Sequence, residues 1–240
     1  MTIGIKGTMR KTTWNSKALH LLGAVALILS VSLEMTVPAL ASPIVASVTE
    51  TTFSTDITDH YVHMPPTVDE GNLLIVLLVN DRNGTVTTPN GWSLLASGTN
   101  GVHVQLSVYC KIADGKGGGT TVNFVTSAAE EAAAQVYRIT NWHGSTLPEI
   151  STAAAGTDMF PDAVSLNPAG WDVANTLWLA VAGQDRGDQS GHVAYPTSYT
   201  YGRNTLSSDG TGSCRIYSAH TLFSAASEDP GPFTIPASEQ

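Results

Sequence analysis

Parts of the first half of this 240-residue chain recur, in the same order, in its second half. An Asn that leads into an apolar run, an Asp at the end of that run, and a turn followed by an aromatic residue occur twice, about a hundred residues apart. The two Asp residues are Asp81 and Asp185, and the two aromatics are Trp92 and Tyr199. Weak matches in a fixed order are typical of a duplicated unit. We therefore predict two pseudo-repeat halves, residues 43–141 and 148–240.

The two halves differ at their ends. In the first half, Glu130 is followed by Gln135–Ile139, which has the composition of a strand. In the second half, the residue that corresponds to Glu130 is Glu239, and only Gln240 follows it. We expect the second half to lack its last strand. Either the reading frame is truncated, or another copy or a partner protein supplies the strand to the open edge.

The chain after residue 42 reads as all-β. Thr, Val, Ser, Tyr and Ile dominate, and Asn-Gly and Asp-Gly turns recur between the candidate strands. The runs Leu73–Val79 and Leu177–Ala182 are almost entirely apolar, which predicts strands covered on both faces. Val102–Val108 alternates and predicts one buried face and one wet face. The fold class expected is an antiparallel β-sandwich of the jelly-roll or immunoglobulin-like type.

The connection between the halves favours one large sandwich. Residues 141–147 are few and include Trp142, an aromatic that a free linker would not need. Two tandem immunoglobulin-like domains are the alternative, because each half has the length of such a domain.

The first 41 residues have the pattern of a secretory signal peptide. A basic lead is followed by the apolar run Leu19–Leu33 and by small residues that predict cleavage after Ala41. The protein is then secreted, extracellular or periplasmic, with no membrane segment after removal of the leader. An uncleaved anchor and translation from Met9 are the alternatives. The β-sandwich domain would comprise residues 42–240.

Several function classes are excluded or lack their motifs. The formal net charge of −9 argues against nucleic-acid binding, which requires a basic face. No Gly-x-Ser-x-Gly elbow and no His-Glu-x-x-His motif occurs. His60 and His63 are an odd number of residues apart, so that on a strand they point to opposite faces and do not form a metal pair.

The remaining candidates for chemistry are paired between the halves. Asp81 and Asp185 end corresponding strands and are the best carboxylate pair for a glycan site, with strand-end turn capping as the structural alternative. Trp92 and Tyr199 are candidates for stacking on sugars, or else they close the core. The oxygen-rich loops 81–84 and 185–188 make Ca²⁺ the cofactor to consider, although neither has the pattern of a dedicated loop. No other cofactor is indicated.

Cys110 and Cys214 lie in corresponding strands of the two halves. If these strands are close in the sandwich, the two thiols can form a disulfide, which an exported protein permits. The alternative is a pair of buried free thiols.

Four short motifs carry a resemblance to a known group of proteins. The chain resembles uncharacterised β-sandwich modules of secreted bacterial proteins and of phage virion or tail proteins, over residues 43–240. The motifs are Gly71–Leu74, Thr88–Trp92, Tyr109–Gly115 and Ala226–Gly231. The resemblance implies a surface or virion module without assigned chemistry. We therefore expect a secreted, non-catalytic structural, adhesion or surface-recognition module. A lectin-like sandwich that binds or cleaves glycans is the alternative.

Overall fold

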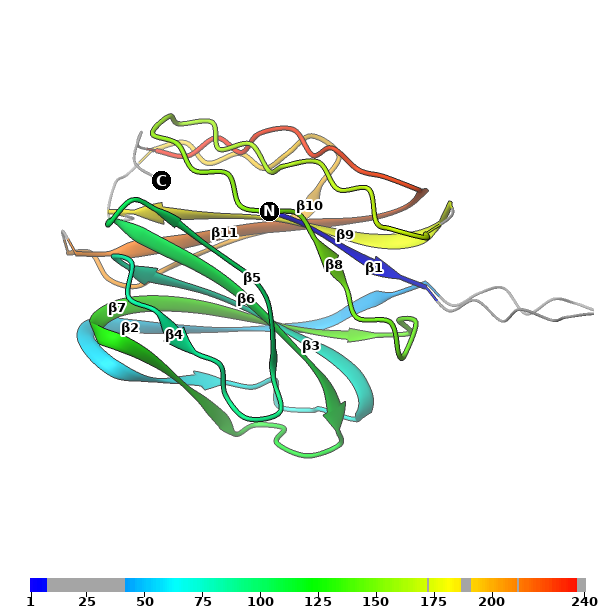
Figure 1. Cartoon of the computed structure of the whole chain (residues 1–240), viewed down its shortest axis with the longest axis horizontal. Coiled ribbons are helices and arrows are strands. Elements are labelled where there is room, and N and C mark those ends of the chain that lie inside the picture. Colours follow the sequence, from blue (N-terminus) through cyan, green and yellow to red (C-terminus); the bar gives the residue numbers. More distant parts are fainter. Residues whose placement is uncertain (8–41, 172, 187–190, 211, 237–240) are drawn as a thin grey trace, which may run out of the picture.

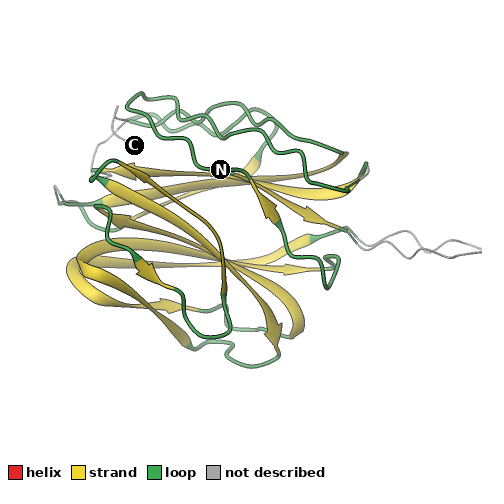
Figure 2. Ribbon diagram, viewed as in Figure 1, coloured by secondary structure: helices red, strands yellow, loops and turns green. Residues whose placement is uncertain are grey.

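The computed structural model describes residues 1–7, 42–171, 173–186, 191–210 and 212–236. These residues form strands and loops, and none of them is in a helix (Figure 1; Figure 2). Two antiparallel sheets pack face to face, which confirms the predicted all-β, sandwich-like fold. In the described part of the chain no helix is long and apolar enough to cross a membrane.

The first half of the chain forms one sheet. Its strands follow the order β2-β7-β3-β6-β5, and the short β4 pairs with β7 away from this path. The strands are β2 (Ile44–His63), β3 (Glu70–Asp81), β4 (Val86–Thr87), β5 (Ser93–Asn100), β6 (Val104–Asp114) and β7 (Thr121–Thr140).

The second half forms the other sheet together with the N-terminal residues. Its order is β8-β1-β9-β11-β10, again with antiparallel pairing throughout. The strands are β1 (Thr2–Lys6), β8 (Glu149–Ile150), β9 (Ala174–Asp185), β10 (Thr200–Leu206) and β11 (Cys214–Ala225). In this order β1 lies beside β9 in the way that β7 lies beside β3 in the first sheet.

Each apolar run is buried on both faces, as predicted. Alternate residues of β3 face a central cluster between the two sheets, where they meet β1, β9 and β11. The other face of β3 packs under the curved β2–β7 pair, which bends at register shifts between Phe53 and Asp59 (Figure 1). The outer face of β9 packs under the loops 155–170 and 191–199 and the C-terminal segment 226–236.

The prediction that the strand after Val102 has one wet face is wrong. Val104–Cys110 of β6 are buried on both faces. The polar residues of this segment are buried because they have partners: the Gln105 amide donates to Ser97 Oγ (2.9 Å), and Ser97 Oγ lies 3.0 Å from Ser107 Oγ. A polar side chain whose hydrogen bonds are satisfied can take the place of an apolar one in a core. The alternation of polar and apolar residues in this strand therefore did not predict which residues are exposed.

The predicted signal peptide is only partly described. Residues 8–41, which include the apolar run and the cleavage site at Ala41, lie outside the described residues. Residues 1–7 are described, and their strand β1 is buried between β8 and β9. Export and cleavage stay predictions, and cleavage after Ala41 would remove β1 from the second sheet.

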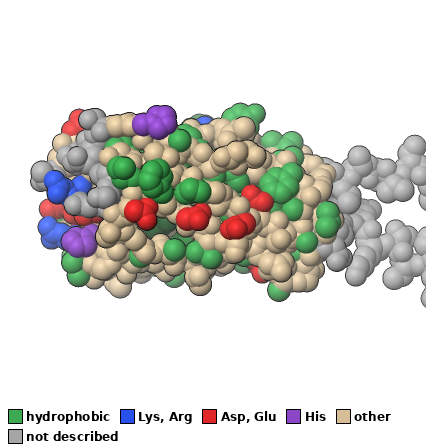
Figure 3. All heavy atoms as spheres, turned by 90° about the horizontal axis from the view of Figure 1, so that it is seen from above, with side chains coloured by type: hydrophobic (Ala, Val, Ile, Leu, Met, Phe, Trp, Pro, Cys, Tyr) green, Lys and Arg blue, Asp and Glu red, His purple; other side chains and the backbone are tan. Residues whose placement is uncertain are grey.

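The surface over the second sheet is acidic and partly apolar. Seen from above, acidic side chains lie along the middle of this face among hydrophobic ones, and few Lys or Arg are visible (Figure 3). Met159 and Phe160 are among the exposed hydrophobic residues. This distribution agrees with the net negative charge of the chain.

Candidate functional site

Strands β3 and β9 end at the same end of the sandwich and bring their last residues into one pocket. Asp81 and Asp185 both line this pocket, which has a volume of about 720 Å³. Each Asp is followed by an Arg in the left-handed backbone region, with φ of 63° at Arg82 and 52° at Arg186. This conformation is unfavourable for a residue with a Cβ atom and ends the strand abruptly. The sequence-predicted carboxylate pair therefore shares one site.

Glu130 of β7 adds a third buried carboxylate. Glu130 is 2% exposed, and no hydrogen-bond donor of the described residues reaches its Oε2 atom. Arg82 is the cation that faces it: Arg82 Nε lies 4.0 Å from Glu130 Oε2 and 3.6 Å from Asp81 Oδ2. Because Arg82 is itself exposed, it compensates the buried charges only weakly. A buried carboxylate oxygen without a donor can accept a hydrogen bond from a ligand.

Glu130 and its neighbour Glu131 point in different directions. Glu131 Oε2 accepts hydrogen bonds from Ser207 Oγ (2.9 Å) and Ser208 Oγ (2.7 Å), while Glu130 lines the pocket. Gly84 forms the wall next to Glu130, since a Cβ atom at this position would lie 3.0 Å from Glu130 Oε1.

The carboxylates change each other's protonation. Burial, together with the negative charges of Asp185 and Glu130, raises the pKa of Asp81 to about 7 against the opposing effect of Arg82. Burial also raises the pKa of Glu130. On the other side of the pocket, His103 Nδ1 lies 3.6 Å from Asp185 Oδ2. Near neutral pH, Asp81 is therefore divided between its acid and its carboxylate forms.

Among the described residues, no group of three or more His, Cys, Asp or Glu side chains is arranged to hold a metal ion. Of the loop 185–188 that suggested Ca²⁺, residues 187 and 188 lie outside the described residues. His60 is buried, with its ring nitrogens 3.2 Å from Phe124 O and 3.1 Å from Glu130 O, whereas His63 is exposed on the other face.

Trp92 and Tyr199 lie in the hydrophobic clusters and not at a sugar-binding surface. Trp92 is 9% exposed and packs with its ring centroid 6.0 Å from that of Phe124. Tyr199 is 8% exposed, and its hydroxyl donates to Glu228 Oε1 (3.2 Å). Stacking on a sugar requires an open ring face. In this arrangement the two aromatics close the core, which was the structural alternative for them.

An exposed aromatic lies two residues further along the chain. Tyr201 is 73% exposed and stacks on His220, with ring centroids 4.9 Å apart and an interplanar angle of 12°. It lines a groove of about 490 Å³ together with Ile44 and Leu222. The β10–β11 ladder has a register shift between Thr200 and Arg203, and Tyr201 has a φ of 52°. Regular alternation from Tyr199 could not predict this outward position.

Cys110 and Cys214 are both free and buried, which is the arrangement named as the alternative to a disulfide. The strands do correspond, but the positions do not: Cys110 pairs with Ile75 within β3, whereas Cys214 pairs with Asp185 at the end of β9. The two cysteines are therefore displaced by several residues along the sandwich, each residue of a strand rising about 3.3 Å. A disulfide requires Cα atoms within about 7 Å.

Comparison with family models, with curated proteins and with solved structures found no match to this chain. The functional argument therefore depends on the site itself.

Proposed function

We propose that this protein is a secreted, non-catalytic β-sandwich module for surface recognition, and that its ligand binds in the acidic pocket at the ends of β3 and β9. The observation that carries the proposal is the pocket itself: Asp81, Asp185 and the donor-free Glu130 line one cavity of about 720 Å³. This volume is in the range of small-ligand sites. Adhesion and structural roles in an extracellular or phage-like particle are compatible with such a module.

The chemistry of the pocket favours a polyhydroxylated ligand such as a glycan. Carboxylate oxygens accept hydrogen bonds from sugar hydroxyls, and a protonated Asp81 donates one. Arg82 and Arg186 at the rim provide further donors. Anionic polymers are disfavoured by the three carboxyl groups and by the net charge of the chain.

The strand orders of the two sheets support the proposed internal duplication. β2-β7-β3-β6-β5 corresponds position by position to β8-β1-β9-β11-β10. We infer that the two halves derive from one repeated unit, and β1 occupies in the second sheet the position that β7 has in the first. The resemblance to secreted and virion β-sandwich modules is part of the same proposal.

Glycan cleavage is the second candidate, on one specific observation. The environment raises the pKa of Asp81 to about 7, next to Asp185 and Glu130. A carboxylic acid that keeps its proton near neutral pH, with a second carboxyl group close by, is what the acid of a glycoside-hydrolysing pair requires. Release of reducing ends that is lost in Asp81→Asn would assign this activity.

A glycan array with matched variants tests the proposal. The variants are Asp81→Asn with Asp185→Asn for the acidic pocket, Tyr201→Ala for the exposed aromatic groove, and Asp114→Asn as a control at an exposed carboxylate. We expect binding that the double variant loses and the control retains. Binding lost only in Tyr201→Ala would move the site to the groove. Binding that no variant changes would refute the acidic pocket.

Export is tested by N-terminal sequencing of protein collected from the medium or periplasm of a secreting host. We expect the mature chain to begin at Ser42, after the predicted cleavage. A protein that keeps residues 1–41 would refute the processed form.

A further inference from the structure

The acidic pocket keeps its negative charges inside and its positive charges at the surface. Asp81, Glu130 and Asp185 are all buried. The basic side chains that face them are not, since Arg82 is 66% exposed and His103 is 65% exposed. Water and salt screen an exposed charge much more strongly than a buried one. The interior of the pocket is therefore more negative than the number of its acidic and basic residues indicates.

Glu130 lacks the hydrogen-bond donor that a buried carboxylate requires. Among the residues that the structure describes, none donates to Glu130 Oε2. Arg82 Nε lies 4.0 Å from this oxygen and 3.6 Å from Asp81 Oδ2, and both distances are too long for a hydrogen bond. The two carboxyl groups thus flank one exposed guanidinium that bonds through Nε to neither. A donor that reached this position would make a hydrogen bond that the chain itself leaves open.

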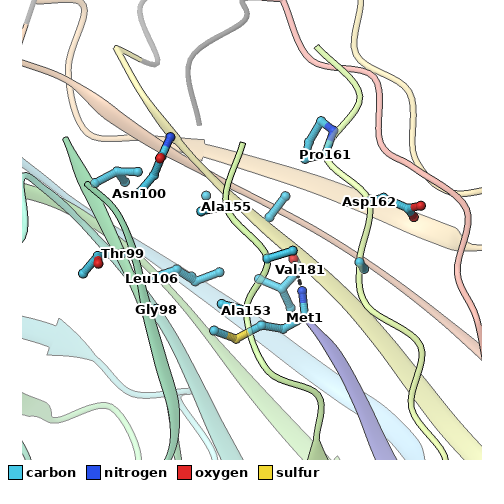
Figure 4. Close-up of a pocket in the computed structure, with 15 residues that line it drawn as sticks. Met1, Gly98, Thr99, Asn100, Leu106, Ala153, Ala155, Pro161, Asp162 and Val181 are labelled. Atoms are coloured by element: carbon cyan, nitrogen blue, oxygen red, sulfur yellow. Dashed lines mark hydrogen bonds between the residues drawn. The ribbon is translucent and has the colours of Figure 1, made fainter. Parts of the chain in front are cut away.

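A second cavity, between the two sheets, offers no comparable opening. It has a volume of about 60 Å³ and is bordered mainly by small or apolar side chains such as Ala153 and Val181 (Figure 4). The buried Met1 amino group there donates to Val181 O (2.9 Å), and the Asn100 amide donates to Gly156 O (2.8 Å). These polar groups already have partners inside the protein. Of the two cavities, the acidic pocket is therefore the one that offers an open acceptor to a ligand.

An ammonium group matches this acceptor better than a hydroxyl does. An ammonium carries a positive charge and three N–H donors, whereas a sugar hydroxyl is neutral and donates once. Hydrogen bonds between charged groups are roughly twice as strong as those between neutral groups. Neighbouring carboxylates also repel one another, and a cation placed among them relieves this repulsion while a neutral hydroxyl does not. The pocket therefore favours a ligand with a protonated amine.

The arrangement of the carboxyl groups favours an ammonium over a metal ion. Bonds from carboxylate oxygens to Ca²⁺ are about 2.3–2.6 Å long, so that its ligands have to converge closely. Charge-assisted N–H···O hydrogen bonds are about 2.7–2.9 Å long and require less convergence. In the described part of the chain, no three acidic or other metal-binding side chains are arranged to hold a metal ion. Carboxyl groups that share a pocket without converging on one point suit an ammonium group.

We propose that the acidic pocket binds a free amino group of its ligand, so that the glycan recognised here is built from amino sugars whose amines are not acetylated. The inference rests on the proposed glycan recognition and narrows it from sugars in general to cationic ones. The ammonium donates to Glu130 Oε2 and takes the place of the Arg82 guanidinium between the carboxyl groups. Arg82 then turns fully into water, which its exposed position allows. The hydroxyl groups of the sugar bond to Asp81 and Asp185.

The role of Arg82 distinguishes a cationic sugar from a neutral one. For a neutral sugar, Arg82 is a further donor at the rim, and its loss weakens binding. For an ammonium, Arg82 competes for the same carboxyl groups, and its loss strengthens binding. Arg82→Asn removes the guanidinium and suits the backbone, because Asn tolerates the left-handed conformation with a φ of 63° at this position.

The test compares three oligosaccharides of equal length and linkage that differ at one position of each sugar. They are oligomers of glucosamine, of N-acetylglucosamine and of glucose, titrated by calorimetry into the full chain. The pH is about 6.5, below the usual pKa of such amines, and the salt is about 0.15 M to screen attraction to the net charge of the chain. We expect the glucosamine oligomer to bind at least roughly tenfold more tightly than the other two, as for one hydrogen bond between charged groups.

Three variants locate the amine. Glu130→Gln keeps the shape of the side chain and should weaken binding of the glucosamine oligomer roughly tenfold. Asp114→Asn removes one exposed carboxylate elsewhere and should leave the affinity unchanged. Arg82→Asn should tighten binding, a gain that misfolding of the variant cannot produce.

Four results would overturn the inference. Equal affinity for the three oligomers, or binding of none of them, would exclude a preference for the amine. Weaker binding in Arg82→Asn would make Arg82 a donor to a neutral group, and equal losses in Glu130→Gln and Asp114→Asn would assign the attraction to net charge. Tighter binding of a lysine oligomer of the same charge would assign a protein ligand. Failure of the proposed function is a different result, a glycan array on which no pocket variant changes binding.

Discussion

Truncation of Ile3 to alanine should destabilise the intact chain by about 3 kcal/mol. Ile3 is 0% exposed, lies in the central cluster, and pairs with Leu179 of β9 and Ile150 of β8. Removal of a fully buried isoleucine to alanine costs about 2–5 kcal/mol, because apolar burial is lost and a cavity remains. A short strand can relax around the cavity, which favours the lower half of this range. The loss would still be a large part of a typical folding free energy of about 5–15 kcal/mol.

The assay is urea unfolding followed by tryptophan fluorescence, on protein whose intact mass shows that residues 1–41 are present. The control is Ile44→Ala in β2, where the side chain is 50% exposed and the expected change is below about 1 kcal/mol. Equal stability of Ile3→Ala and the parent chain would refute the reasoning, because β1 would then contribute nothing to the fold.

Three further predictions address the pocket, the thiols and the core. The pKa of Asp81 rises from 3.8 to about 7 on folding, so its contribution to stability is lost as pH rises from about 4 through 7. Asp81→Asn should therefore be more stable than the parent above pH 7, by about 1 kcal/mol once solvent screening in the open pocket is allowed for. Cys110 and Cys214 should react with aqueous thiol reagents only after unfolding, and reductant should leave the intact mass unchanged. Gln135→Ala should cost about 2–3 kcal/mol and be non-additive with Ser218→Ala in a double-mutant cycle of urea unfolding, because the buried Gln135 Oε1 accepts from the Ser218 hydroxyl.

The features that the sequence predicted well are those set by strong local patterns. Leu73–Val79 is apolar at every position, and both faces of such a strand have to be buried against other parts of the protein. The Asp81 and Asp185 positions were predictable because each ends such a run, and equivalent strand ends in a sandwich lie at the same edge.

The features that the sequence missed depend on register and long-range pairing. Cys110 and Cys214 are in corresponding strands, but Cys110 lies opposite Ile75 in the middle of β3, whereas Cys214 lies opposite Asp185 at the end of β9. Tyr201 turns outward at a ladder irregularity. Thr2–Lys6 has no local sign of its pairing with β9, because the contact joins segments far apart in the chain. Glu130 reaches the pocket because β7 bends at this point. The Ala-rich sequence around Glu130 does not predict this bend.

The central claim is that three carboxyl groups from β3, β7 and β9 line one pocket. The most direct test is a carbon-detected NMR titration of the Asp81 side-chain carboxyl in the intact protein. The account predicts a pKa of about 7, and a lower pKa in Asp185→Asn, where one of the two repelling charges is removed. A pKa near 4 that does not change in Asp185→Asn would contradict the account, because Asp81 would then be solvated and distant from Asp185.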